Sequence, residues 1–297
     1  MPSELSAQQI DDILQGIQIP AQPQIMADLQ MEQAMPDPDL KEIARLISKD
    51  VGISGYILKT VNSPFFGTSR EILSINQAVV LLGMNTVINL VNTIALRNEM
   101  HNDANIPEEL QKFLTIYWDS AMDVAAVCMI IAQLLDYRDS EKAYTLGLFH
   151  NVGIPMLISR FENYRTIMYA SYAADAEKII DLENQHMNTN HAVLGYYVTK
   201  SWKLPKQICD VVALHHNAEE MFSPSANYDD ERKTLFCILK MAEHIFGFHE
   251  QVAGNKVDLE WEKHKETILG YLSVSEFEYD EIISNCQNKG FGLHLSD

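Results

Sequence analysis

Helical spacing of apolar residues runs through almost the whole chain. Leu40, Ile43, Ala44 and Ile47 follow one another at three- and four-residue steps, which places them on one face of a helix. The same spacing recurs over residues 113–135 and again over 235–246. No alternating strand pattern persists along the sequence, and no internal repeat of a solenoid type is evident. The sequence therefore predicts an all-α fold built from many helices.

The chain is long enough to form two packed lobes. It has 297 residues, of which 47% are hydrophobic, so it can bury a sizeable core. A polar, turn-rich segment, HNDANIP at residues 101–107, interrupts the helical pattern. We therefore predict an N-terminal helical lobe over residues 1–104, a C-terminal helical lobe over 105–285 and a tail over 286–297.

Residues 72–96 are uncharged over a length that could span a bilayer. The stretch nevertheless carries five carboxamide side chains, whose burial in hydrocarbon is costly. Gly83 is placed to end one helix, and Asn85 to begin the next. Two buried helices are therefore the preferred interpretation, and no membrane span is expected.

Charge and cysteine content restrict the partners and the compartment. The formal net charge is −19, and no run of Lys or Arg stands out, which disfavours nucleic acid and anionic membranes as partners. The four cysteines lie far apart without a CxxC pair, as expected in a reducing compartment. The first residues resemble no secretory leader, and no glycine-rich phosphate loop is found. We expect a cytoplasmic protein.

The side chains that could carry chemistry are histidines and carboxylates on separate predicted helices. Helical metallohydrolases assemble their metal sites in this way, because each helix presents one or two ligands inward. The candidate ligands are His150, His191, His215, His216, Asp119 and Glu243.

Three further segments are distinctive. The first reads DVGISGYILKTVNSPFFG and continues as SINQAVVLLGMNTVINLV, the second reads YTLGLFHNVGIPML, and the third reads NHAVLGYYVTKSWKLPKQICDVVALHHN. Together they resemble the HDOD domain family, a relative of the metal-dependent HD phosphohydrolases, in the family's order over about residues 10–250. This resemblance implies an N-terminal helical lobe packed on an HD-like helical lobe. It also implies a role in bacterial signal transduction.

The resemblance can be carried over position by position. An active HD enzyme has an early His, a His-Asp doublet, further His residues and a late Asp. In this chain Asp119 stands at the early His position, Asn151 replaces the Asp of the doublet, and Glu243 replaces the late Asp. The family's other histidine positions are kept, as His150, His191, His215 and His216.

The change to Asn151 bears most on metal binding. An Asp carboxylate can bridge two cations, whereas the neutral Asn amide is a weaker ligand for a divalent ion. We therefore expect no cofactor, with a single divalent metal ion held by the six candidate ligands as the alternative. The same side chains also have a structural explanation, in which a buried His hydrogen-bonds within the core and a His at a helix end caps free carbonyl groups. This explanation is favoured over a working site.

Three functions follow from these observations. The preferred one is a non-catalytic signalling module that binds signalling proteins. The second is a divergent metal-dependent phosphohydrolase acting on a nucleotide or cyclic dinucleotide. The third is a sensor that binds such a ligand in the altered pocket without cleaving it.

Overall fold

The computed structural model describes residues 14, 16, 17, 19, 23–62, 70–101, 107–173, 178–252 and 254–291. Every regular element within these ranges is a helix, so the all-α prediction is confirmed for this part of the chain. In chain order the helices are α2 (Gln24–Gln33), α3 (Leu40–Ile47), α4 (Val51–Val61), α5 (Ile75–Leu82), α6 (Met84–His101), α7 (Glu108–Leu134), α8 (Ser140–Phe149), α9 (Gly153–Arg160), α10 (Tyr164–Ala173), α11 (Ile180–Met187), α12 (His191–Ser201), α13 (Lys206–Leu214), α14 (Ala218–Met221), α15 (Asp230–Phe246), α16 (Phe248–Gln251), α17 (Leu259–Leu272) and α18 (Glu276–Asn288).

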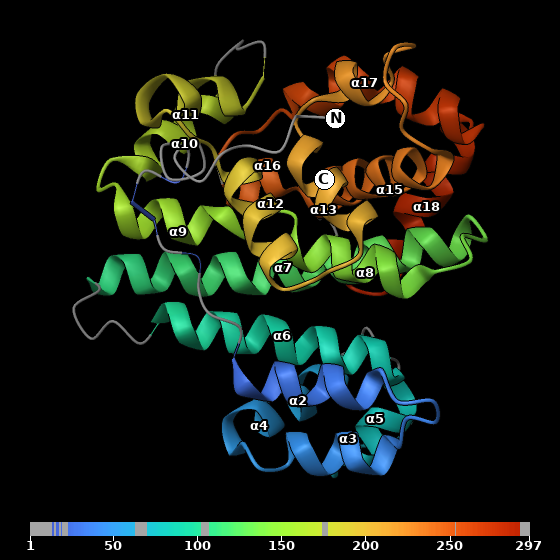
Figure 1. The fold of residues 1–297 in the computed structure, drawn as a ribbon. Helices are drawn as coiled ribbons and strands as arrows, with labels where there is room; N and C mark the ends of the chain where they lie inside the picture. The colour runs from blue at the N-terminus through green and yellow to red at the C-terminus, as the bar shows by residue number, and fades with distance from the viewer. Residues whose placement is uncertain are drawn as a thin grey trace.

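Helices α2 to α6 pack together on one side of the molecule, and α6 also packs against α8 (Figure 1). The uncharged stretch forms α5 and most of α6, and the chain bends by 117° between the two helices. Gly83 lies between them with a φ of 78°, a left-handed conformation that glycine adopts without strain. The prediction of two helices separated at Gly83 is therefore correct.

The predicted lobe boundary at residue 104 falls between α6 and α7, within 102–106, outside the described residues. The predicted start of the tail, at residue 286, falls inside α18. That helix begins at a capping box formed by Ser275 and Glu278, and it continues to Asn288. Cys286 is fully buried, so the chain remains part of the core beyond residue 285.

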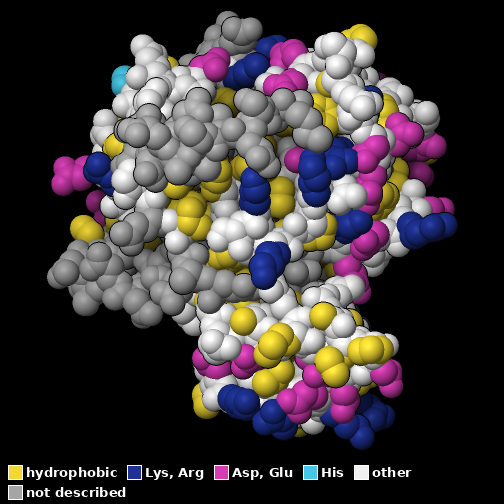
Figure 2. Space-filling view, viewed as in Figure 1, with side chains coloured by type: hydrophobic (Ala, Val, Ile, Leu, Met, Phe, Trp, Pro, Cys, Tyr) yellow, Lys and Arg dark blue, Asp and Glu magenta, His cyan; other side chains and the backbone are white. Residues whose placement is uncertain are grey.

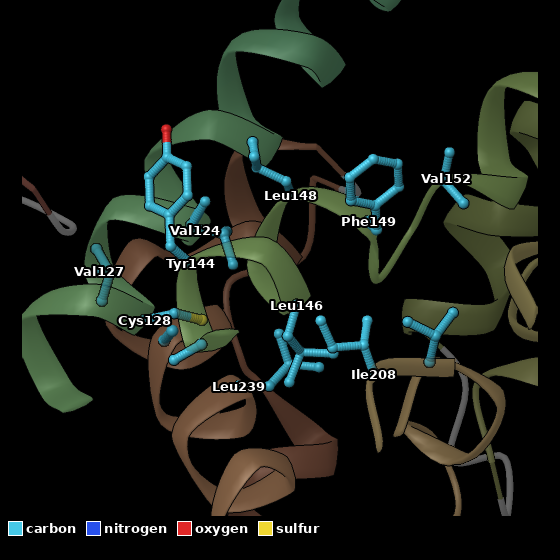
Figure 3. Packing of buried hydrophobic residues seen from close by; sticks show 14 of the residues in the cluster. Val124, Val127, Cys128, Tyr144, Leu146, Leu148, Phe149, Val152, Ile208 and Leu239 are labelled. Atoms are coloured by element: carbon cyan, nitrogen blue, oxygen red, sulfur yellow. The ribbon is translucent and has the colours of Figure 1, made fainter. Parts of the chain in front are cut away.

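Helix α7 forms the centre of the larger group of helices. It is long and apolar enough to cross a membrane. Its most apolar stretch of 18 residues is nevertheless 72% buried inside the protein, as in a core helix. Figure 3 shows Val124 and Cys128 of α7 beside Tyr144 and Leu146 of α8, with Leu239 of α15 close to Leu146. All five side chains are at most 1% exposed. This core supports the ends of α8, α12 and α13, where the candidate site lies.

Candidate functional site

The turn after α8 carries the doublet. Phe149 is the last residue of α8, His150 follows as its C-terminal cap, and α9 begins at Gly153. The hydroxyl of Tyr117 on α7 donates a hydrogen bond of 2.7 Å to the carbonyl oxygen of Asn151. His150 and Asn151 expose 0% and 1% of their surface. The doublet is therefore held inside the core.

A close backbone contact brings α12 to this turn. A Cβ atom at Gly153 would lie 2.1 Å from the carbonyl oxygen of His191, so only glycine fits there. His191 is the first residue of α12, and Asn190 caps that helix by accepting a hydrogen bond of 2.9 Å from the Val193 N–H. His191 is thereby fixed beside the doublet.

His215 and His216 follow directly after α13 and complete the group. The ring centroid of His215 lies 5.2 Å from that of His191 and 5.7 Å from that of His150. The His215 and His216 rings are 4.1 Å apart. Four histidines from three places in the sequence thus form one buried group, the histidine cluster (His150, His191, His215 and His216).

Every ring of the histidine cluster is hydrogen-bonded through Nδ1. His150 and His215 donate from Nδ1 to the carbonyl oxygens of Gly147 and Val212, each at 2.7 Å. The other two rings use carboxylates: Nδ1 of His191 lies 2.8 Å from Glu183, and Nδ1 of His216 lies 2.9 Å from Glu260. Such contacts fix the tautomer and leave the Nε2 lone pair free.

The Nε2 atoms of His191 and His215 lie close together. Nε2 of His191 lies 3.3 Å from Nε2 of His215, which in turn lies 3.1 Å from Oδ1 of Asn151. Nε2 of His150 and Nε2 of His216 have no hydrogen-bond partner. In a neutral ring whose Nδ1 carries the proton, Nε2 is the lone-pair atom. An arrangement of this kind presents ring nitrogens to a cation.

Two carboxylates and a lysine lie beside the cluster. The Lys240 ammonium donates to Glu243 at 2.7 Å and to Glu260 at 2.8 Å. The other oxygen of Glu243 lies 3.4 Å from Nε2 of His150. Burial opposes ionisation of Glu243, but Lys240 and His150 outweigh it and hold the pKa of its carboxyl well below its usual range. Burial likewise opposes ionisation of Glu260, but His216 and Lys240 lower its pKa to about 2.

The protonation of two rings follows from their surroundings. Burial holds the pKa of His215 well below its usual range, and the neighbouring His216 and His191 lower it further. Burial also lowers the pKa of His216, although Glu260 acts in the opposite direction. Both rings are therefore neutral at pH 7, which is the form that binds metal ions.

One predicted ligand lies elsewhere. The Asp119 carboxylate is 58% exposed and lies 3.9 Å from the guanidinium of Arg97 on α6. The prediction that Asp119 joins the metal ligands is therefore wrong. The reason is helix geometry: Tyr117 and Trp118 are buried in α7, and the next residue in the helix points outward. The other five predicted residues do come together in the core.

Three residues of the site were not predicted: Glu183, Lys240 and Glu260. Glu183 is 1% exposed and also accepts a hydrogen bond of 2.7 Å from the Tyr164 hydroxyl. Only Lys240 left a signal in the sequence, because it precedes Glu243 by one helical turn and so lies on the same face. The contact between Glu260 and His216 joins positions 44 residues apart.

The donor set fits one metal ion at the histidine end. His191, His215 and His216 each offer a ligand atom, and these atoms lie within 4.8 Å of one another. Three ring nitrogens suit Zn²⁺ and other borderline ions better than Mg²⁺. At the other end, Lys240 already occupies the carboxylates of Glu243 and Glu260, and the doublet offers only the amide of Asn151. The residues therefore do not fit a standard two-metal site.

Two hollows are found among the described residues, one beside the histidine cluster and one apart from it. A pocket of about 20 Å³, which is room for one water molecule, lies beside Lys240, Glu243 and Glu260. A larger groove, of about 410 Å³, lies between α2 and α6 on one side and α8 and the start of α13 on the other. We call it the lobe groove. Its residues include Gln30, Gln33, Asn85, Asn89, Asn92, Lys142, Thr145, Lys203 and Ile208.

Comparisons with known proteins connect this architecture to one family. A sequence model of the HDOD domain family matches residues 19–218. An uncharacterized protein of Treponema pallidum is 28% identical over 225 residues, which cover 73% of this chain and 41% of that protein. The uncharacterized protein YuxH of Bacillus subtilis is 25% identical over 126 residues, 42% of this chain and 28% of that protein. The chain thus matches less than half the length of these relatives.

Solved structures share the fold. An HDOD domain protein of unknown function from Geobacter sulfurreducens superposes with a TM-score of 0.61 at 18% identity, covering 91% of this chain and 95% of that one. A candidate phosphohydrolase from Shewanella amazonensis gives 0.62 at 20% identity, covering 94% and 95%. A candidate signal transduction protein from Marinobacter aquaeolei gives 0.64 at 15% identity, covering 95% and 60%. At these identities the likeness is one of fold.

Proposed function

This chain belongs to the HDOD domain family, and from that premise we propose that it is a bacterial signal-transduction module that acts by binding and does not hydrolyse its ligand. The resemblance expected from the three sequence segments is thereby confirmed. The binding mode, the absence of turnover and the partner are the proposal. Signalling proteins are the expected partners, with a nucleotide or cyclic dinucleotide as the alternative ligand.

One observation carries this proposal: the space that a ligand can enter lies apart from the residues that could do chemistry. The four histidines expose 0–2% of their surface. The pocket beside their carboxylate partners has room for one water. A phosphoryl group would have to reach the Nε2 atoms to be hydrolysed there. This arrangement favours a structural cluster over a substrate site.

The lobe groove supports binding elsewhere. Its volume of about 410 Å³ lies in the range of small-molecule and peptide sites. Carboxamide side chains of α2 and α6 line one wall, and the other carries both signs of charge, from Lys142, Lys203, Asp139 and Glu141. Oδ1 of Asn92 is buried beneath the groove without a hydrogen-bond partner. A ligand in this groove would contact helices of both predicted lobes, so it could change how they pack.

The surface of the N-terminal helices also suits a protein partner. Large apolar side chains are exposed there, including Met31 at 66%, Leu73 at 73% and Val80 at 72%. Figure 2 shows hydrophobic side chains gathered on the lower part of the molecule, where α2 to α5 lie. Exposed apolar groups of this kind mark interaction surfaces. The described cysteines are all free, which fits action in the reducing cytoplasm.

A second function is favoured by the convergence of ring nitrogens. His191, His215 and His216 would hold a divalent ion, and such an ion, when bound, acts as a Lewis acid and activates water. His150 would stand beside it, with Glu243 at 3.4 Å from its Nε2. This is the divergent metal-dependent phosphohydrolase. It requires the cluster to open to solvent before a nucleotide or cyclic dinucleotide can enter.

A thermal-shift experiment tests the proposed function. The full chain is melted with a panel of nucleotides and cyclic dinucleotides, and each mixture is then analysed for hydrolysis products. We expect a ligand to raise the melting temperature and to be recovered intact. In Asn85→Leu, which changes an exposed amide of the groove, the shift should be lost, whereas it should persist in Asn76→Leu, which changes an exposed amide of α5 outside the groove. Product release, or a full shift in Asn85→Leu, would contradict the proposal.

A further inference from the structure

Lys240 is a charged residue buried beside the histidine cluster. It lies on α15, one turn before Glu243, and its side chain is 6% exposed. Burying an ammonium group is costly unless opposite charges compensate it. Glu243 at 2.7 Å and Glu260 at 2.8 Å provide that compensation. Burial favours the neutral amine, but the two carboxylates outweigh it and raise the pKa of Lys240 above its usual range.

The two carboxylates also connect the ammonium to the cluster. Glu243 reaches His150, with 3.4 Å between Oε1 and Nε2, and Glu260 reaches Nδ1 of His216 at 2.9 Å. Lys240 therefore lies between two carboxylates, each of which also contacts an imidazole of the cluster. Groups of these types bind divalent ions in helical metalloproteins. Here a lysine holds the two carboxylates.

We infer that Lys240 is a built-in cation that takes the place of a metal ion between Glu243 and Glu260. A divalent ion and an ammonium group repel each other and would compete for the same oxygens. The lysine thus prevents metal binding at the carboxylate end and leaves the histidine end as the one place for an ion among the described residues. This inference goes beyond the proposed function, because it concerns charge balance and holds whether or not the chain has activity.

The inference predicts that removing the ammonium creates a metal site. Lys240→Met keeps a long side chain but leaves the buried Glu243 and the partly buried Glu260 without the ammonium counter-ion. In chelator we expect its melting temperature to fall by roughly 10 °C, as for breaking a buried ion pair in a domain of this size. Added Zn²⁺ should then restore most of that loss, and the variant should bind one Zn²⁺ per chain more than the wild type does, measured by metal analysis after gel filtration.

Two control variants isolate the cause. Lys240→Arg keeps the positive charge and should gain no metal. The double variant Lys240→Met with Glu260→Gln removes one carboxylate with the ammonium, so it should be less destabilised and should also gain no metal. If Lys240→Met is unfolded in chelator, Zn²⁺ should refold it.

Three results would overturn the inference: Lys240→Met melting like the wild type in chelator, Lys240→Met binding no additional Zn²⁺, or an unfolded Lys240→Met that Zn²⁺ does not refold. These readouts do not depend on hydrolysis. The inference can therefore fail while the proposed function stands, and the reverse also holds.

Discussion

Each histidine of the cluster is oriented by what its Nδ1 atom contacts, which is a backbone carbonyl for His150 and His215 and a carboxylate for His191 and His216. His150, His191, His215 and His216 could be predicted because each lies in a recognisable segment, and Glu243 could be predicted because it stands at the position of the family's late Asp. Glu183 and Glu260 could not, because a carboxylate that hydrogen-bonds a histidine ring leaves no local pattern. The prediction for Asp119 was wrong because its match to a ligand position of the family does not tell which side of α7 faces the core.

Asp123 provides a test of electrostatics at a residue outside the cluster. Burial and the nearby charge of Asp119 raise the pKa of Asp123 to about 6, against about 3.9 for an unfolded chain. Because the folded pKa is raised, its contribution to stability is fully present below pH 4 and is lost as the pH rises through 6. At pH 7.5 the ionised carboxylate costs up to about 3 kcal/mol.

Asp123→Asn should therefore stabilise the chain, since the amide resembles the protonated acid. We expect the free energy of unfolding, measured by urea denaturation, to rise by about 1–2 kcal/mol at pH 7.5 and to match that of the wild type at pH 4. Asp280→Asn, at an exposed position of α18, should change it by less than about 0.5 kcal/mol. An equal effect at both pH values would rule out this explanation.

At the scale of helices, the ends of helices can be predicted from the sequence where they depend on residues close together in the chain. Ser275 with Glu278 forms a capping box, Asn190 caps α12, and Gly83 separates α5 from α6. All three depend on contacts within a few residues. The contact between α9 and α12 could not be predicted, because it depends on two backbones that meet only in the folded chain.

Gly153→Ala tests this contact. The added Cβ would lie 2.1 Å from the His191 carbonyl oxygen, so the doublet turn or α12 must shift. We expect a loss of about 2–4 kcal/mol in the free energy of unfolding, as for a severe overpacking change. Gly270→Ala, in α17, is the matched control because nothing lies within 4 Å of its Cβ position. It should stabilise the helix by about 0.5–1 kcal/mol. Equal effects of the two changes would contradict the assigned role of Gly153.

At the scale of the whole molecule, the lobe groove and the histidine cluster are separate features. The groove lies between the α2–α6 group and the helices beyond α7, whereas the cluster is buried among α8, α12, α13 and α15. Family resemblance could predict the arrangement of helices. It could not show that the potential metal ligands are closed off, because exposure depends on how every helix packs around them.

The most direct test of the account is the initial rate of hydrolysis of bis(p-nitrophenyl) phosphate by the full chain after loading with Zn²⁺ or Mn²⁺. The rate is compared with that of His150→Ala, which removes a ring from the cluster. We predict equal rates for the two proteins, both at the level of metal ion in buffer. A wild-type rate well above that level, and lost in His150→Ala, would contradict the account and establish a working phosphohydrolase.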